Sequence, residues 1–170
     1  MHPLKDKTLF ITGASRGIGK AIALRAARDG ARIVIVAKTE TPHDRLPGTI
    51  YTAAEEIEAA GGQALPLAVD IRFEDRVAAA VDKAAAHFGG IDILVNNAGI
   101  RRDAVLAMMR QENWQRVLDV NLTGGYNMCR FAIPLMMKQK YGRIIFITSP
   151  MGHLGFAGQS NYAASKAGQV

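Results

Sequence analysis

The chain has 170 residues, of which 49% are hydrophobic and 21% charged, and its formal net charge is +6 at pH 7. This length and composition are typical of one globular domain, and no apolar run reaches the roughly 18 residues that a membrane span needs. The basic residues are scattered without a Lys/Arg block, which argues against a nucleic-acid partner. A single cysteine, Cys129, and a start without a signal-peptide pattern predict a cytoplasmic protein.

Strand-like and helix-like segments alternate along the whole chain. Apolar runs predict strands over 8–12, 32–37, 64–69, 91–95 and 143–148. Helical spacing predicts helices over 18–29, 50–60, 73–88 and 114–138, a short helix before 114, a loop over 150–158 and a last helix around Tyr162. Such alternation is typical of βαβ units. The sequence therefore predicts one α/β domain over 1–170, a Rossmann-like, doubly wound parallel sheet with five strands.

The first strand runs into a glycine-rich loop in which Gly13, Gly17 and Gly19 are spaced Gly-x-x-x-Gly-x-Gly. Glycines between a buried strand and a helix let a pyrophosphate approach the N–H groups at the helix N-terminus. The spacing differs from the common Gly-x-Gly-x-x-Gly fingerprint of dinucleotide sites. Taken alone, the loop fits a structural turn equally well.

The end of the second strand bears on the choice of cofactor. A free ribose 2′-hydroxyl is usually held there by an acidic residue, but this chain has Lys38 and Thr39, with Arg16 in the glycine-rich loop within reach of the same place. Two cations without a carboxylate suit a 2′-phosphate. NADP(H) is therefore predicted over NAD, with Glu40 as the residue that argues the other way.

Near the C-terminus, Tyr162 and Lys166 are four residues apart, which places both on one face of a helix. An ammonium beside a phenol stabilises the phenolate and lowers the tyrosine pKa. Such a pair can donate a proton near neutral pH. On its own the spacing also fits a solvated helix face.

Several motifs in register resemble the short-chain dehydrogenase/reductase family, over residues from about 7 to the end. They are Thr12-Gly13-x-x-x-Gly17-x-Gly19, Asn96-Asn97-Ala98-Gly99, Asn121, Ser149 and Tyr162-x-x-x-Lys166. The resemblance implies an enzyme that reduces a carbonyl to an alcohol by hydride transfer from a nicotinamide.

The same resemblance implies roles for individual residues. Tyr162 would protonate the substrate oxygen, and Lys166 would hold the nicotinamide ribose and lower the tyrosine pKa. Ser149 would hydrogen-bond the substrate carbonyl. The backbone of Asn121 would hold a water of a proton relay. Asp70 would hydrogen-bond the adenine.

The resemblance also implies a set of cofactor contacts. These are Gly13, Ser15, Arg16, Gly17, Ile18, Gly19, Lys38, Thr39, Asp70, Ile71, Asn96, Ala98, Gly99, Tyr162 and Lys166. No metal is expected, because His153 has no second ligand at metal-binding spacing.

Two branches of the family resemble different parts of the chain. Met1–Val95 resembles hydroxysteroid-dehydrogenase-like proteins, and Asn96–Val170 resembles the 3-oxoacyl-[acyl-carrier-protein] reductases of fatty acid biosynthesis. The second resemblance implies a 3-oxoacyl thioester substrate and docking of the acidic carrier protein at Lys138, Lys140 and Arg143. The same charges would also complement the dipole of a helix end without any partner.

Family members are longer, with further strands after the Tyr162 helix. The chain is therefore expected to be truncated at its C-terminus relative to the family, with its fifth strand at a sheet edge. Self-association through the long helix is also expected. The alternatives are a reductase of another small ketone or steroid, and a truncated, non-catalytic NADP-binding module.

Overall fold

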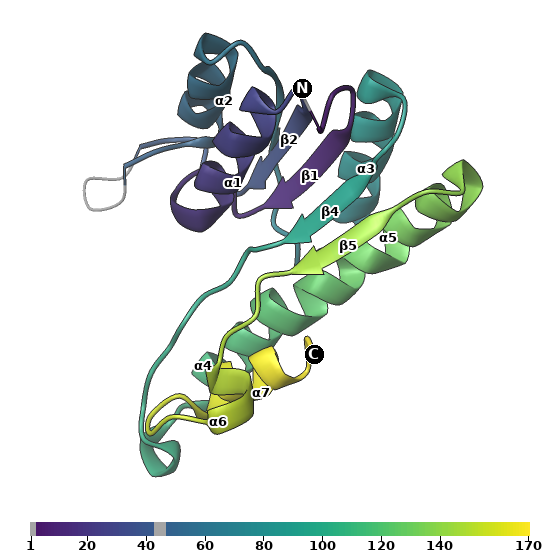
Figure 1. Cartoon of the computed structure of the whole chain (residues 1–170). Coiled ribbons are helices and arrows are strands. Elements are labelled where there is room, and N and C mark those ends of the chain that lie inside the picture. Colours follow the sequence, from purple (N-terminus) through teal and green to yellow (C-terminus); the bar gives the residue numbers. More distant parts are fainter. Residues whose placement is uncertain (1–2, 43–46) are drawn as a thin grey trace.

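A computed structural model describes residues 3–42 and 47–170 (Figure 1). Five parallel strands form one sheet in the order β3-β2-β1-β4-β5. The strands are β1 (Thr8–Thr12), β2 (Arg32–Ala37), β3 (Gln63–Ala68), β4 (Ile93–Asn96) and β5 (Arg143–Phe146). This arrangement confirms the predicted Rossmann-like, doubly wound sheet.

Helices cover both faces of the sheet. The helices α1 (Gly17–Arg28) and α2 (Ile50–Ala59) share a hydrophobic cluster with Leu9 and Ile11 of β1. The helices α3 (Glu74–Phe88) and α5 (Gly124–Gln139) share a second cluster with Phe10. Side chains alternate between the faces of a strand, so β1, buried along its whole length, contributes to both clusters.

The predicted long helix contains an irregular turn. It begins with α4 (Gln111–Leu118), passes through a π-helical turn, η2 (Asp119–Thr123), and continues as α5. The π-turn contains Asn121, and such turns are frequent at functional sites.

The remaining short helices lie beyond the carboxyl ends of β4 and β5 (Figure 1). They are η1 (Leu106–Met108), α6 (Met151–Leu154) and α7 (Ser160–Ala167). The prediction of a loop over 150–158 was wrong at α6. A helix of four residues is too short to show a periodic apolar pattern.

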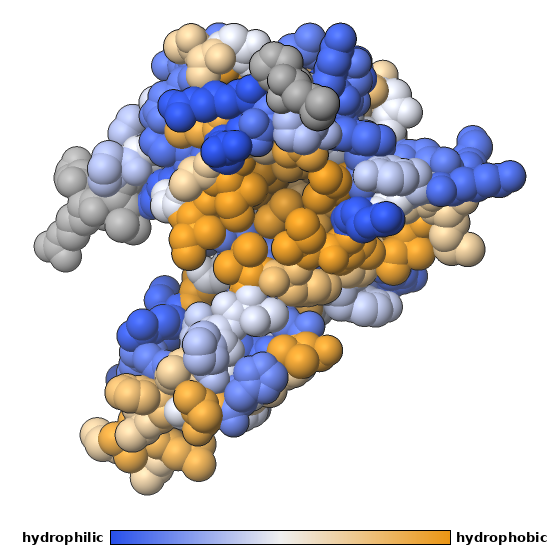
Figure 2. All heavy atoms as spheres, in the orientation of Figure 1, coloured by the Kyte–Doolittle hydropathy of each residue, from blue (hydrophilic) through white to orange (hydrophobic). Residues whose placement is uncertain are grey.

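An apolar surface is exposed on the sheet. Figure 2 shows hydrophobic residues gathered over β4 and β5, on the face that lies toward the viewer in Figure 1. β5 is last in the strand order, and Ile144 and Ile145 are 37% and 45% exposed. The expectation that the fifth strand forms a sheet edge is therefore confirmed. No helix among the described residues is both long and apolar enough to cross a membrane.

Thr12 links β1 to the segment that follows β4. Its buried hydroxyl accepts hydrogen bonds from the N–H groups of Asn97 and Ala98, both at 3.0 Å, and donates to the Val95 carbonyl at 3.4 Å. The link fixes the carboxyl ends of two neighbouring strands relative to each other.

Thr12→Val is therefore expected to lower the free energy of unfolding by about 2–4 kcal/mol, because two N–H groups lose their acceptor at unchanged side-chain volume. Urea unfolding measures the change. Thr12→Ser, which keeps the hydroxyl, should lose clearly less. Equal losses in the two variants would show that the methyl group matters rather than the hydrogen bonds.

Candidate active site

The glycine-rich loop packs closely against the segment after β4. Gly13 has a positive φ of +67°, and a Cβ there would lie 2.9 Å from the Ala98 Cα. The Asn97 side chain donates to the carbonyls of Thr12 (2.9 Å) and Gly13 (3.2 Å). Gly17 has φ +58°, and a Cβ at this position would have no neighbour within 4 Å among the described residues. Gly13 is thus required for close packing against Ala98, whereas a Cβ at Gly17 would meet no described residue.

A cavity of about 410 Å³ lies at the carboxyl ends of β1, β2 and β4, and we call it the cationic cavity. Its charged lining residues are Arg16, Lys38, Asp70, Arg72, Arg102 and Arg116. The only carboxylate among these described lining residues, Asp70, is held by the Arg72 guanidinium at 2.6 Å. That hydrogen bond keeps the pKa of Asp70 below its usual value. The cavity therefore presents a surplus of positive charge, which favours an anionic ligand.

Arg16 has hydrogen-bonding capacity to spare in this cavity. Its Nη2 donates to the Gly48 carbonyl at 2.9 Å. Its Nε is buried and has no hydrogen-bond partner among the residues that the structure describes. A buried donor without a partner is costly, so an anionic group bound here would satisfy it.

A second cavity, of about 300 Å³, lies between the glycine-rich loop, the end of β5 and α7, and we call it the Tyr162 cavity. It brings Tyr162 and Lys166 together, with the lysine Nζ 5.8 Å from the centre of the tyrosine ring. Lys166 is only 4% exposed, and its Nζ donates to the Ile147 carbonyl at 2.6 Å and to Gln169 Oε1 at 3.1 Å. Burial lowers the pKa of Lys166.

Asn121 ties the loop after β4 to α7. Its buried side chain accepts from the Ile100 N–H at 2.8 Å and donates to Ser165 Oγ at 3.0 Å. Its main-chain carbonyl accepts a hydrogen bond from Gln169 Nε2 at 2.5 Å. Gln169 thus bridges the π-turn and Lys166. Sequence reasoning missed Gln169, for which the only available signal was its position three residues after the lysine.

The two cavities contain most of the residues that the sequence singled out. Gly13, Ser15, Arg16, Lys38, Thr39, Asp70, Ile71, Ala98 and Gly99 line the cationic cavity. Ile18, Gly99, Tyr162 and Lys166 line the Tyr162 cavity. Sequence reasoning gave no role to Arg101, Ile147 and Thr148, which also line the Tyr162 cavity together with Asn97 of the Asn96–Gly99 motif.

Five of the expected site residues line neither cavity: Gly17, Gly19, Asn96, Asn121 and Ser149. The Asn96 side chain donates to Cys129 Sγ of α5 at 3.6 Å, which places it on the face of the sheet that α5 covers. Ser149 Oγ accepts from the N–H of Met151 at 3.3 Å, at the first turn of α6. Since Oγ is an acceptor in that bond, its hydroxyl proton can still be donated to a ligand.

The geometry combines a proton donor with an anion-binding surface. A phenol beside a buried ammonium can give up a proton and hold the resulting charge. The neighbouring cationic cavity suits phosphate groups, and the glycine-rich loop joins the two cavities.

Comparisons with known proteins agree with this geometry. A sequence profile for the family described as short chain dehydrogenase matches residues 7–170. The chain is 54% identical over 144 residues to hydroxysteroid dehydrogenase-like protein 2 of Xenopus laevis, covering 85% of this chain and 34% of that protein. The Danio rerio protein of the same name is 49% identical over 163 residues, covering 95% of this chain and 39% of that protein.

The fold has close structural relatives as well. A short-chain type dehydrogenase/reductase from Mycobacterium marinum matches with a TM-score of 0.90 at 36% identity, over 99% of this chain and 66% of that one. The chain spans roughly a third of the length of the two curated relatives described above. The resemblance to hydroxysteroid-dehydrogenase-like proteins is confirmed, and it extends well beyond residue 95.

Proposed function

The chain belongs to the short-chain dehydrogenase family, and from this we propose that it is an NADP(H)-dependent oxidoreductase that reduces a carbonyl to an alcohol. The observation that carries the proposal is the presence of Tyr162 and buried Lys166 in one cavity, beside the glycine-rich loop. The pair supplies a proton donor where the family's nicotinamide cofactor supplies a hydride.

The cationic cavity fits a dinucleotide with a 2′-phosphate. Arg16 and Lys38 would hold that phosphate. The Arg16 Nε has no hydrogen-bond partner among the described residues, so it could donate to the phosphate. Asp70 and Ile71 would contact the adenine. Glu40, the residue that argues for NAD, accepts a hydrogen bond from the Tyr51 hydroxyl at 3.0 Å. Glu40 is not among the lining residues of the cationic cavity. Because its carboxylate is bonded to Tyr51, it is less available to hold a ribose 2′-hydroxyl, which supports NADP over NAD.

The residues of the Tyr162 cavity would move and stabilise one proton. Tyr162 donates its phenolic proton to the substrate oxygen, and the Lys166 ammonium stabilises the phenolate that remains. Ile147 and Gln169 hold the ammonium in place. Ser149 would donate its hydroxyl proton to the substrate carbonyl. Asn121 would position α7 through its side chain, and its main-chain carbonyl, which accepts one hydrogen bond from Gln169, keeps a second lone pair for a relay water.

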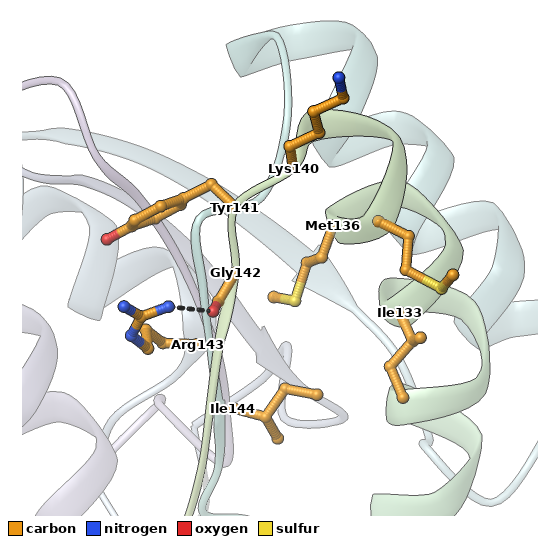
Figure 3. Close-up of a pocket in the computed structure, with 8 residues that line it drawn as sticks. Ile133, Met136, Lys140, Tyr141, Gly142, Arg143 and Ile144 are labelled. Atoms are coloured by element: carbon orange, nitrogen blue, oxygen red, sulfur yellow. Dashed lines mark hydrogen bonds between the residues drawn. The ribbon is translucent and has the colours of Figure 1, made fainter.

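The first candidate substrate is a 3-oxoacyl thioester. A groove of about 400 Å³ between α5 and β5 is lined by the apolar Ile133 and Ile144 and by the cations Lys140 and Arg143 (Figure 3). With exposed Lys138 nearby on α5, it offers an acidic carrier protein both charge and apolar contact. Exposed apolar residues of α5, among them Ile133 and Met137, would also support a homo-oligomer.

Two other functions stay open to test. One is reduction of a steroid or another small ketone, which the names of the similar hydroxysteroid dehydrogenase-like proteins favour. The other is a non-catalytic NADP-binding module, which the cationic cavity alone would support.

The test is NADPH oxidation by the 170-residue chain with acetoacetyl-N-acetylcysteamine, a steroid ketone and cyclohexanone as substrates. Oxidation with any of them supports the reductase, and the preferred substrate identifies the class. NADPH binding without oxidation would support the module instead. A chain that neither binds nor oxidises NADPH would contradict both the reductase and the module.

Cofactor preference yields a separate prediction. Lys38→Asp is expected to weaken NADPH binding by about tenfold to a hundredfold, because a charge-assisted contact worth about 1.5–3 kcal/mol is lost. NADH binding should stay the same or improve, since an acid at this place can hold a free ribose. Equilibrium titration of both cofactors checks this. Lys83→Asp on the exposed face of α3 is the charge-matched control. Equal losses for the two cofactors would contradict the role of Lys38.

A further inference from the structure

The loop after β4 carries two adjacent arginines that line different cavities. Arg102 lines the cationic cavity, whereas Arg101 lines the Tyr162 cavity. The proposed proton transfer uses Tyr162 and Lys166 and leaves Arg101 without a role. Its side chain is 59% exposed, so it lies at the mouth of the cavity, where a substrate would enter.

The Arg101 guanidinium is held in a fixed orientation. Its Nη2 donates to Asp103 Oδ2 at 2.5 Å, and its Nε lies 3.4 Å from Oδ1. The same Asp103 carboxylate accepts from Gln159 Nε2 at 3.2 Å. Gln159 is buried and directly precedes α7. This chain of contacts therefore fixes the guanidinium relative to the helix that carries Tyr162.

Asp103 engages only part of this guanidinium. Arginine has five N–H donors, and the Nη1 group of Arg101 has no hydrogen-bond partner among the residues that the structure describes. The other cation of the cavity, Lys166, is buried and already bonded to Ile147 and Gln169. A lysine has three N–H donors, so Lys166 keeps one free, whereas Arg101 keeps both N–H groups of Nη1 at the exposed mouth of the cavity.

The rest of the cavity is suited to a small anion. No aspartate or glutamate is among its described lining residues, and its apolar wall comes from Ile18, Ile100 and Ile147. Arg101 also lies near the reacting group, because it lines the same cavity as Tyr162. An anionic group at Arg101 would therefore lie close to a carbonyl that faces the phenol.

We propose that Arg101 is a specificity-determining residue whose free N–H groups bind a carboxylate next to the reacting carbonyl, so that the substrate is a short oxo acid. This inference rests on the proposed reductase and changes the expected acyl group from a thioester to a free acid. A planar guanidinium matches a carboxylate in both charge and shape. A thioester has no charge beside its 3-oxo group and would leave Arg101 unused.

The test compares binding of acetoacetate with binding of its neutral methyl ester. Both are titrated by calorimetry into the 170-residue chain, with and without NADP⁺, which has no hydride to transfer to the ketone. We expect acetoacetate to bind at least about tenfold more tightly than the ester, in keeping with one charge-assisted contact. Arg101→Gln should remove this preference, and Arg101→Lys should restore part of it.

Arg110→Gln is the matched control, because it removes one exposed arginine from the same connection without touching the cavity lining. It should keep the wild-type preference for the acid. Thermal unfolding of each variant checks that the fold is intact. The proposal is overturned if wild-type protein binds acid and ester equally, if Arg101→Gln keeps the preference, or if acetoacetate binds in neither condition.

The outcome is independent of turnover. Arg101-dependent binding of acetoacetate without NADPH oxidation would support the carboxylate site and contradict the proposed reductase. NADPH oxidation with the thioester, but without an Arg101-dependent preference for the acid, would support the reductase and contradict the carboxylate site.

Discussion

Tyr162→Phe is expected to lower the rate of NADPH oxidation by about 10²–10⁴-fold, the usual contribution of a positioned general acid. The variant loses only the phenolic hydroxyl, so the ring keeps its place beside Lys166 in the cavity. NADPH affinity should change little, because the proposed phosphate contacts are residues of the cationic cavity. Steady-state oxidation and equilibrium binding of NADPH measure the two effects separately.

Tyr126→Phe provides the matched control. This tyrosine lies on α5 and is 57% exposed, so loss of its hydroxyl should leave the rate unchanged. Wild-type turnover in Tyr162→Phe would contradict the assignment of Tyr162 as the proton donor. A loss of NADPH binding as large as the loss of rate would mean that the hydroxyl serves the cofactor instead.

The sheet could be predicted from the sequence because its strands are apolar runs bounded by glycines. β1 is buried along its whole length, and a continuous apolar run such as Phe10-Ile11 is typical of a strand that is covered on both faces. The proximity of Arg16 and Lys38 was predicted from the strand ends, whereas Asp70 was expected at the cofactor from the family resemblance. In parallel sheets, residues at the carboxyl ends of neighbouring strands gather at one edge, and Arg16, Lys38 and Asp70 do so here.

Asn96 was predicted to contact the cofactor, but its side chain lies on the face of the sheet that α3 and α5 cover. Its direction could have been found from the alternation of side chains along a strand. Leu94, two residues earlier, belongs to the cluster that α3 and α5 cover, and Asn96 shares its face. Asn97 then points back toward the glycine-rich loop.

Other features depend on contacts that no local pattern encodes. The helical spacing of apolar residues continues through Asp119–Thr123, so the π-turn at Asn121 has no periodic signature. The Gln169 bridge and the Arg101–Asp103–Gln159 chain join segments that only the folded chain brings together. Their residue types are common on solvated surfaces, so the sequence offers no reason to select them.

Lys166→Met is expected to abolish turnover and, at the same time, to stabilise the fold. The ammonium is almost fully buried and bonds only to the neutral oxygens of Ile147 and Gln169. No carboxylate among the described residues forms an ion pair with it. Replacing an uncompensated buried charge by an apolar side chain of similar length should raise the free energy of unfolding by about 1–2 kcal/mol, after the loss of the hydrogen bond to Ile147.

The pH dependence of this gain has a definite sign. Burial places the folded-state pKa of Lys166 below the ordinary value of a lysine, so the unfolded chain binds this proton more tightly. The destabilisation by Lys166 is therefore fully present below its folded pKa and disappears as the pH rises toward the unfolded pKa. Urea unfolding of wild type and variant should show a difference at neutral pH that shrinks toward about pH 10.

Lys138→Met on the exposed end of α5 controls for a general effect of removing one positive charge, and it should change stability little at either pH. A less stable Lys166→Met would show that the two neutral acceptors compensate the buried ammonium fully. A gain in stability with loss of turnover would show that the charge is kept at a cost to the fold because the chemistry requires it. A non-catalytic module would gain the same stability but would have no turnover to lose, so comparing turnover in the wild type and in Lys166→Met separates the enzyme from the module.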